Sequence, residues 1–345
     1  MKRHILGYMV ALGCAMGANA AVIEVSPGTD TLQTAIQSSA PGDVLVLEEG
    51  IYSWSGDAAK PFTIFHDLTI RGENSATKPT IDVIDLNGIK VMSFSGLDTE
   101  VVFQNIKFTS ERKDKVNPVV GIPPLESFTA VDCDFSVAFD FQQTSPIPNR
   151  TKYIHIIGGY ASTQLNNTWN RKWELRASNQ IVIAGMTFSN TPIDVWAGGN
   201  GFYFVGNEYS TYGWRDLIDG SIRLKKGNHN IVGNNFNQDY SIVKQTSSSY
   251  LDGADAAPII GAYSLSTINV SNNTFSLGQN KLGNLGSPES SVAIYVNDDS
   301  ASLNITNNVF HHETINTTTN SKRPTIDVKS GVKDTRLTFA VTTPP

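Results

Sequence analysis

One six-residue pattern returns along most of the chain and limits the folds that the chain can adopt. The pattern is an apolar residue, four further positions and then an aromatic ring, often with Asn two positions before the ring. Its clearest copies are Phe204–Tyr209, Ile231–Phe236, Val270–Phe275 and Ile305–Phe310, and its weaker copies are Phe103–Phe108, Ala130–Phe135 and Ile183–Phe188. The copies begin 21 to 39 residues apart, except for one gap of 53 residues, where we expect a degenerate copy near Ile154–Gly159.

The fourth position of this hexad forms a column of its own. It is Ile106, Cys133 and Met186 in the first three copies, and Asn207, Asn234, Asn273 and Asn308 in the last four. The residue two positions before a copy is usually apolar: Val101, Phe128, Ile181, Phe202, Ile268 and Leu303. This period of two predicts strands with one buried face. We expect each Asn of the column to lie at a tight bend in left-handed geometry and to bond to the Asn of the next coil.

Repeats of this length predict a stacked array in which neighbouring units bury a shared core. The units are short strands separated by Gly, Asn and Ser, without an amphipathic helix between them. A propeller needs four strands in each repeat of roughly 40–50 residues, and a sandwich shows no common column. The sequence therefore predicts an all-β fold: a single-stranded right-handed parallel β-helix that forms one solenoid domain over residues 21–345.

The first 20 residues have the features of a cleaved secretory signal: basic Lys2 and Arg3, an apolar run, and a small-residue cleavage site that ends at Ala20. Lipidation at Cys14 is the alternative. The net charge is −6, or −8 without Lys2 and Arg3, which argues against a nucleic-acid partner. No later segment is long and apolar enough to span a membrane. We expect a secreted or periplasmic monomer in which Cys133 is a buried apolar residue.

The start of the chain predicts a strand, a short helix and then the first coils. Val22–Val25 and Val44–Leu47 read as strands, and Thr31–Ser39 as an amphipathic helix with Asp30 or Thr31 as its N-cap. This helix would cover the open end of the solenoid. Further strands are expected at Leu68–Gly72 and Arg336–Val341. Longer loops at Glu111–Val116, Gln142–Lys152 and Ser247–Ala257 are expected to form walls beside the binding face.

A second set of short strands precedes the hexads and should stack into another sheet. These are Trp173–Arg176, Ile193–Trp196, Ile222–Lys225, Ser241–Lys244, Val292–Val296 and Ile326–Lys329. Alternation places one set of residues inward: Leu175, Ile193, Val195, Ile222, Leu224, Val243, Ile294 and Val328. The outward column is then Glu174, Arg176, Asp194, Trp196, Arg223, Lys225, Lys244, Tyr295, Asn297, Asp327 and Lys329.

The outward column combines cations, carboxylates and aromatic rings, which suits an acidic polysaccharide, because rings stack on sugars and cations pair with uronates. An ordinary solvated sheet face of mixed charge is the alternative. Trp169, Trp173, Trp196 and Trp214 lie in one region, which favours a sugar groove, although packing under loops is the better expectation for Trp169 and Trp214 taken singly. The candidate substrate-binding residues are Glu174, Arg176, Asp194, Trp196, Arg215, Tyr295 and Asn297.

The region from Ile193 to Phe236 resembles the parallel β-helix polysaccharide lyases. The run Asp219-Gly220, Arg223 and Lys226-Gly227, closing on Asn234-Asn235-Phe236, looks like a pectate lyase segment. This chain has Arg223 where that family usually places a calcium-binding Asp. Alginate and chondroitin lyases of the same fold use a Lys and an Arg on neighbouring coils; Lys225 or Lys226 matches the Lys, and Lys244 falls near the Arg. The opening at Leu32–Tyr52 also looks like the N-terminus of this second group.

This resemblance implies β-elimination from a uronic acid, in which a cation or metal neutralises the carboxylate and a Lys removes the neighbouring proton. The candidate catalytic residues are Arg223, Lys225, Lys226 and Lys244, whose like charges would lower one another's pKa. Ca²⁺ is the candidate cofactor, with Asp194, Asp216 and Asp219 as ligands; Asp216 and Asp219 fit turn positions equally well. A hydrolase would need a carboxylate pair, which only Glu174 and Asp194 offer. A non-catalytic glycan-binding or adhesin-like β-helix remains the alternative, because fold alone does not fix function.

Overall fold

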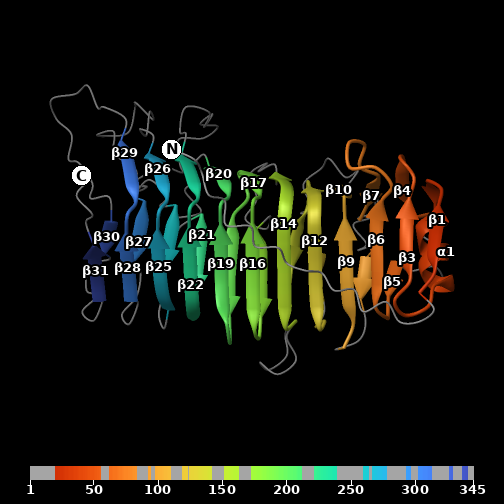
Figure 1. The fold of residues 1–345 in the computed structure, drawn as a ribbon, viewed down its shortest axis with the longest axis horizontal. Coiled ribbons are helices and arrows are strands. Elements are labelled where there is room, and N and C mark those ends of the chain that lie inside the picture. Colours follow the sequence, from red (N-terminus) through yellow and green to blue (C-terminus); the bar gives the residue numbers. More distant parts are fainter. Residues whose placement is uncertain are drawn as a thin grey trace, which may run out of the picture.

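Stacked coils of short parallel strands make up the described part of the molecule (Figure 1). The computed structural model describes residues 20–55, 62–83, 92–94, 98–109, 119–122, 124–141, 151–162, 172–211, 221–238, 259–263, 266–277, 293–296, 302–312, 326–328 and 336–340. The predicted signal segment up to residue 19, including Cys14, lies outside these ranges. So do Trp169, Trp214 and nearly all of the three predicted loops.

The strands form three rows that run along the molecule, and strand pairings within the rows are parallel. The first row contains β1 (Val22–Val25), β3 (Val44–Leu47), β6 (Leu68–Gly72), β9 (Glu100–Gln104), β12 (Ser127–Phe135), β14 (Tyr153–Ser162), β16 (Gln180–Ala184), β19 (Gly201–Val205), β22 (Gly227–Val232), β25 (Ser266–Ser271), β28 (Ser302–Thr306) and β31 (Arg336–Ala340). The second row contains β2 (Gly28–Thr29), β4 (Ile51–Ser53), β7 (Thr80–Asp82), β10 (Lys107–Thr109), β17 (Thr187–Ser189), β20 (Glu208–Thr211), β23 (Asn235–Gln238), β26 (Thr274–Leu277) and β29 (Val309–His312). The long strands β12 and β14 join the two rows, because each pairs with strands of both.

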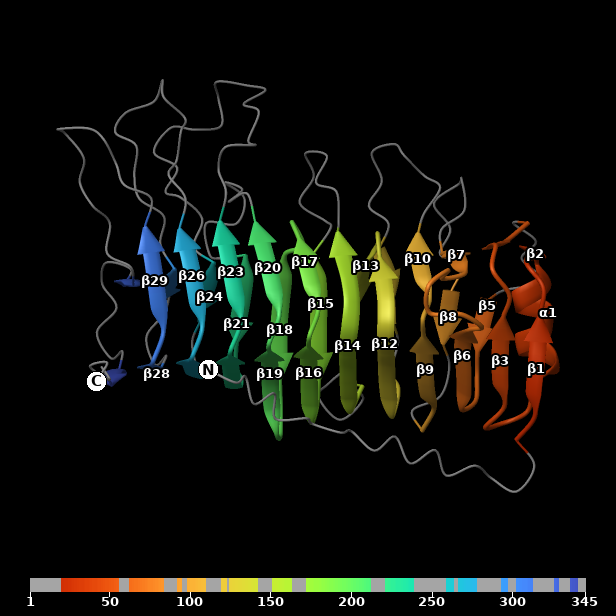
Figure 2. The ribbon, with the colours of Figure 1, turned by 45° about the horizontal axis from the view of Figure 1, so that its top comes forward.

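The third row is a separate 8-stranded sheet in the described part of the chain. It contains β11 (Val119–Gly121), β13 (Ala138–Asp140), β15 (Trp173–Ala177), β18 (Ile193–Ala197), β21 (Ile222–Lys225), β24 (Ile260–Ala262), β27 (Ile294–Val296) and β30 (Ile326–Val328). Its strands appear beside those of the first two rows in Figure 2. Strands β5 (Phe62–Ile64) and β8 (Met92–Phe94) pair with each other.

The repeated hexad is the unit of this stack, as predicted. Its first position follows the strand register through the first row: Ile23, Leu45, Ile70, Phe103, Ala130, Ile156, Ile183, Phe204, Ile231, Val270, Ile305 and Phe339. Its ring position stacks aromatic side chains, with centroids 4.7 Å apart for Phe236 and Phe275 and 5.0 Å apart for Phe275 and Phe310. An apolar column therefore runs through neighbouring coils.

The degenerate copy exists, two residues later than predicted. Ile156 is paired with Ala130 and Ile183, and Ala161 with Phe135. The copy is therefore Ile156–Ala161, and the sequence hid it because Ala replaces the ring and Gly159 replaces the fourth residue. Glycine is required there: φ of Gly159 is 90°, and a Cβ would lie 2.0 Å from the Cys133 carbonyl oxygen.

The Asn column forms the predicted ladder. The Nδ2 of Asn207, Asn234 and Asn273 donates to the Oδ1 of the next Asn at 3.0, 2.9 and 2.9 Å. The same Oδ1 atoms also accept from the backbone N–H of the preceding Asn. The second Nδ2 hydrogen binds a carbonyl of the preceding coil, such as that of Phe204 at 2.8 Å for Asn234. Each buried amide is thereby satisfied, and each ties its coil to two neighbours.

The left-handed geometry expected of the ladder Asn residues belongs to the residue before each of them. Positive φ occurs at Asn105, Asp132, Gly158, Gly185, Gly206, Gly233, Asn272 and Asn307. The bend is made at this third position, where Asn, Asp and Gly tolerate the conformation. The fourth side chain is then free to point inward and join the column.

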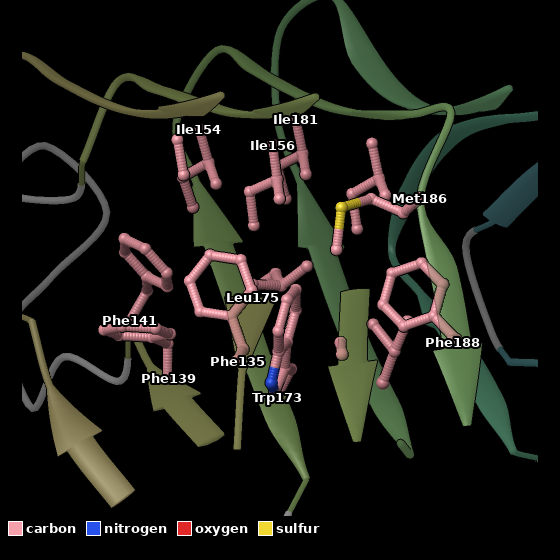
Figure 3. Close-up of a cluster of buried hydrophobic side chains, with 14 of the residues drawn as sticks. Phe135, Phe139, Phe141, Ile154, Ile156, Trp173, Leu175, Ile181, Met186 and Phe188 are labelled. Carbon is pink, nitrogen blue, oxygen red and sulfur yellow. The ribbon is translucent and has the colours of Figure 1, made fainter. Parts of the chain in front are cut away.

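The core is continuous between the rows and is rich in aromatic rings (Figure 3). Trp173 is fully buried among Phe135, Phe139 and Phe188, and its Nε1 donates to the carbonyl of Val137 at 3.3 Å. Trp173 is therefore a core residue and no part of a sugar groove. Cys133 is buried as predicted, and burial raises the pKa of its thiol to about 12.

The single described helix, α1 (Thr31–Ser38), lies beside β1 at the end of the stack (Figure 1). It buries Leu32, Ala35 and Ile36, as its sequence predicted. Asp30 is the N-cap residue, but its side chain does not cap the helix and accepts the backbone N–H of Ser55 at 2.9 Å instead. Within the described residues no helix has the length and apolar character needed to cross a membrane.

We predict that Asn234→Ala lowers the free energy of unfolding by about 3 kcal/mol, because the change leaves the Phe204 carbonyl and the Asn207 N–H buried without a partner. The midpoint of urea unfolding, followed by circular dichroism, measures the effect. The control is the next residue: Asn235 is exposed and its side chain contacts Glu208 at 2.8 Å. Asn235→Ala should change stability by less than about 0.5 kcal/mol. Equal effects of the two variants would show that the ladder does not stabilise the coils.

Candidate functional site

Three neighbouring strands of the third row, β15, β18 and β21, bring six predicted site residues together. The register places Glu174, Asp194 and Arg223 in one outward column and Arg176, Trp196 and Lys225 in the next. The residues between the columns, Leu175, Val195 and Leu224, are fully buried, so the predicted alternation is confirmed. Adjacent strands stand about 4.8 Å apart, which brings side chains of one column into contact.

Asp194 is the centre of the cluster. Its carboxylate accepts hydrogen bonds from Nζ of Lys172 at 3.0 Å, from Nζ of Lys225 at 3.2 Å and from Nη2 of Arg223 at 2.6 Å. Arg223 also donates through Nε, which makes the pair bidentate. The side chain of Asp194 is 3% exposed, although its column faces away from the core. Three cations therefore cover a carboxylate that would otherwise be solvated.

Glu174 extends this network by one strand. Its carboxylate pairs with Lys172 at 2.7 Å and with Arg176 at 3.0 Å. The linked group holds four cations (Lys172, Arg176, Arg223 and Lys225) and two carboxylates, so its formal charge is +2. With Asp140, in register with Glu174 on β13, the formal charge of these described residues is +1. The site is thus locally cationic in a chain of net charge −6.

The titration of Asp194 reflects its partners. Burial by itself raises the pKa of this carboxyl, but Arg223, Lys225 and Lys172 outweigh that effect and hold the pKa below its usual value of 3.8. The carboxylate consequently stabilises the native state above the unfolded-state pKa of about 3.9. This stability is lost as the pH falls through the lowered pKa of the folded state.

Trp196 lies between two cations. Its ring centroid is 5.1 Å from Cζ of Arg176 and 5.2 Å from Nζ of Lys225, which come from the two flanking strands. These cation–π contacts leave less ring surface for a sugar than the stacking prediction required. Among the described residues, Nε1 of Trp196 and Nε of Arg176 are buried without a hydrogen-bond partner. Both N–H groups belong to the second column, and both are shielded from solvent.

Several predicted residues lie elsewhere. Lys226 is exposed at the bend after β21. Tyr295 is half-buried on β27, in register with Gly261. Five other predicted site residues lie outside the described residues: Arg215, Asp216, Asp219, Lys244 and Asn297. The ranges that the structure describes contain no group of three His, Cys, Asp or Glu that could hold a metal ion. The predicted calcium set is represented there by Asp194 alone, which is paired with cations.

The strand next to β21 differs from the prediction. The expected neighbour was Ser241–Lys244, but β21 pairs with Ile260–Ala262, and Gly261 follows Arg223 in the first column. Ser241–Lys244 itself lies outside the described residues. Asp194 also lies between Arg223 and Lys225, so the like-charge proximity predicted for these cations is offset by an opposite charge.

Sequence reasoning missed Lys172 and Tyr263. Lys172 contacts both carboxylates and lies two positions before Glu174, so the same alternation extended by one step would have found it. Tyr263 lies two positions after Gly261, and its ring centroid is 6.0 Å from Nζ of Lys225. Tyr263 could not be placed, because the strand that precedes it was not predicted.

We predict that Asp194→Asn lowers the free energy of unfolding at pH 7 by roughly 3 kcal/mol, because three cations lose their shared partner. The difference between the variant and the native chain should begin to shrink as the pH falls below about 3.9, where the carboxyl of the unfolded chain takes up a proton, and should vanish as the pH falls through the lowered pKa of folded Asp194. Thermal melts over a pH series measure both effects. Glu126→Gln is the control, because Glu126 pairs with Lys152, whose side chain is 50% exposed, and should cost less than about 1 kcal/mol. A pH-independent difference would contradict the assigned role of the charge.

Comparisons with known proteins identify no relative from which a function could be inferred. No family model matches the chain, and no curated protein sequence matches it significantly. The described site is a cationic cluster on the outward face of a parallel sheet, anchored on a buried carboxylate. Its chemistry is the basis on which a function can be proposed.

Proposed function

We propose that the protein binds or cleaves an acidic, uronate-containing polysaccharide on the outward face of β15, β18 and β21. The observation that carries the proposal is the cationic excess of the Asp194 cluster in an acidic chain. A ligand carboxylate gains from this excess, because hydrogen bonds between charged groups are the stronger ones. Cations on β15 and β21, the two strands that flank β18, suit a polymer with repeated carboxylates.

The two outward columns have different roles in the proposed binding of the polysaccharide. Asp194 fixes Arg223 and Lys172 in place, while Arg176 and Lys225 border Trp196. Side chains held in this way lose less conformational entropy when a ligand binds. Arg176 is the best candidate for a carboxylate contact, because its side chain is 18% exposed and its guanidinium suits bidentate recognition.

The enzymatic form of the proposal is a lyase, as the resemblance to the β-helix polysaccharide lyases implies. A cation pairs with the uronate carboxylate, a base removes the proton beside it, the bond to the leaving glycosidic oxygen breaks, and a carbon–carbon double bond forms. The leaving oxygen takes up a proton. Lys226 is the candidate base, because it is exposed at the bend beside the cluster. Lys225 is the second candidate, and its contact with Asp194 suits a charge-stabilising role better.

The second candidate function is non-catalytic glycan binding. It is favoured by the ion pairs themselves: Lys172, Arg176, Arg223 and Lys225 each contact a carboxylate of the protein. Such cations hold an anion without removing a proton. Both functions fit a secreted or periplasmic monomer with a right-handed coil, an N-terminal helix that caps the stack, and Ca²⁺ as a candidate cofactor. These properties are parts of the proposal.

The test is ultraviolet absorbance of residues 21–345 mixed with alginate, pectate or chondroitin sulfate, each with and without Ca²⁺. A rise with one substrate that is lost in Lys226→Ala or Lys225→Ala establishes a lyase, because elimination creates an unsaturated uronate.

Binding to the same glycans is measured by calorimetry. Arg176→Ala should weaken binding about tenfold, since a hydrogen bond to a charged group is lost. Lys152→Ala, which removes a cation that pairs with Glu126 instead of the cluster, should bind normally. Binding without a rise in absorbance supports the non-catalytic function. The absence of both binding and an absorbance rise would overturn the proposal.

A further inference from the structure

We propose that His229 is a positioning residue that holds Lys225 in the anion-binding cluster from inside the solenoid. This inference rests on the proposed function for its effect on ligand binding, and on geometry alone for its effect on Lys225. His229 lies on β22, directly after the corner that follows β21. Its side chain is fully buried and is not part of the outward columns.

His229 breaks the pattern of the column in which it stands. The residues in register with it on the neighbouring strands are apolar: Phe128, Ile154, Ile181, Phe202, Ile268 and Leu303. The imidazole is fully buried and contacts the ring of Phe202, with centroids 6.1 Å apart. A polar residue in a dry apolar column costs free energy unless it makes a useful hydrogen bond. This exception occurs in the coil that supplies Arg223 and Lys225.

The imidazole makes one hydrogen bond, and it reaches the site. Nε2 lies 2.8 Å from the backbone carbonyl oxygen of Lys225, which accepts the Nε2–H. Nδ1 is buried and has no hydrogen-bond partner among the described residues. Burial lowers the pKa of His229 to about 4, so the ring is neutral at physiological pH and carries its proton on Nε2. The carbonyl of Lys225 is thus the only hydrogen-bond partner that this buried ring has within the described structure.

The corner that His229 ties down is the tightest of the three at the site. Ile231 lies six positions after Lys225, whereas Phe204 lies eight positions after Trp196 and Ile183 seven after Arg176, although the register makes these positions equivalent. Gly227 makes the close approach, because a Cβ there would lie 2.1 Å from the carbonyl oxygen of Ala197. The short path brings the imidazole under the end of β21.

This tether determines where the Lys225 side chain leaves the sheet. The ammonium must reach Asp194 at 3.2 Å, Trp196 at 5.2 Å and Tyr263 at 6.0 Å at the same time. Lys225 is the last residue of β21, where ladder hydrogen bonds end, so its backbone needs another constraint. The bond from His229 supplies that constraint. An unpaired Nδ1 is then the cost of positioning a cation for function.

The test compares three variants of the full chain. His229→Phe keeps a ring in a column that already holds Phe128 and Phe202, and it removes the donor. His229→Gln keeps an N–H donor at a similar reach and should restore the native behaviour. Phe202→Leu is the control, because it disturbs the packing beside His229 without touching the bond to Lys225. Thermal melts confirm that each variant folds.

Two readouts follow Lys225 in these variants. The first is the rate at which acetic anhydride modifies Lys225 relative to its exposed neighbour Lys226, read by mass spectrometry. The second is calorimetric affinity for alginate, pectate and chondroitin sulfate. His229→Phe should raise the relative modification rate and weaken binding, each by roughly fivefold, the factor that corresponds to one hydrogen bond. His229→Gln and Phe202→Leu should leave both readouts near native values.

The outcomes separate the inference from the function on which it rests. If the native chain binds none of the three glycans, the proposed function fails, and the modification rate still decides whether His229 holds Lys225. If the native chain binds a glycan and His229→Phe binds it equally well with an unchanged modification rate, the positioning role is overturned. An equal loss in Phe202→Leu would also overturn it, because packing alone would then explain the effect.

Discussion

The register between successive coils is the constraint on which the rest of the structure depends. Each coil repeats the slots of the previous one, and a shift by one residue would move its buried side chains to the outer face. The Asn ladder opposes such a shift, because each amide binds the next Asn and a carbonyl of the preceding coil. The apolar columns stabilise the stack by burial, which does not depend on precise orientation, whereas the hydrogen bonds of the ladder require a specific alignment of the coils. Together they make a stack of separate short strands behave as one sheet.

The candidate site follows from the same register on the opposite side of the coil. Strand spacing brings Glu174, Asp194 and Arg223 into one column, so charges far apart in sequence become neighbours. A carboxylate as buried as Asp194 would be unfavourable alone, because desolvation opposes its charge. Three cations offset that cost, and the lowered pKa of Asp194 records the balance. The buried carboxylate is therefore the organiser of the cations around it.

The sequence was sufficient to predict where strands lie and which of their side chains are buried. Both features follow from the order of residues within one coil, through the alternation of apolar residues and the repeated hexad. Val44–Leu47, Leu68–Gly72 and Ile222–Lys225 were predicted with the bounds that the structure shows. It was insufficient for features that depend on how far the chain travels between rows. The strand beside β21 was predicted at Ser241–Lys244, which lies outside the described residues, whereas β21 pairs with Ile260–Ala262. The burial of Asp194 and the role of Lys172 also depend on contacts between coils, which no single-coil pattern contains.

The internal ion pairs limit what kind of ligand the site can hold firmly. A ligand carboxylate must compete with Asp194 and Glu174, which already partner the same cations. Only the cationic excess is available for net gain, so a single carboxylate gains little. A polymer that presents several carboxylates along successive strands sums these small gains without paying the cost of association again at each contact. The geometry thus favours a long acidic polysaccharide over a small acidic sugar, and it makes ionic strength a strong determinant of affinity.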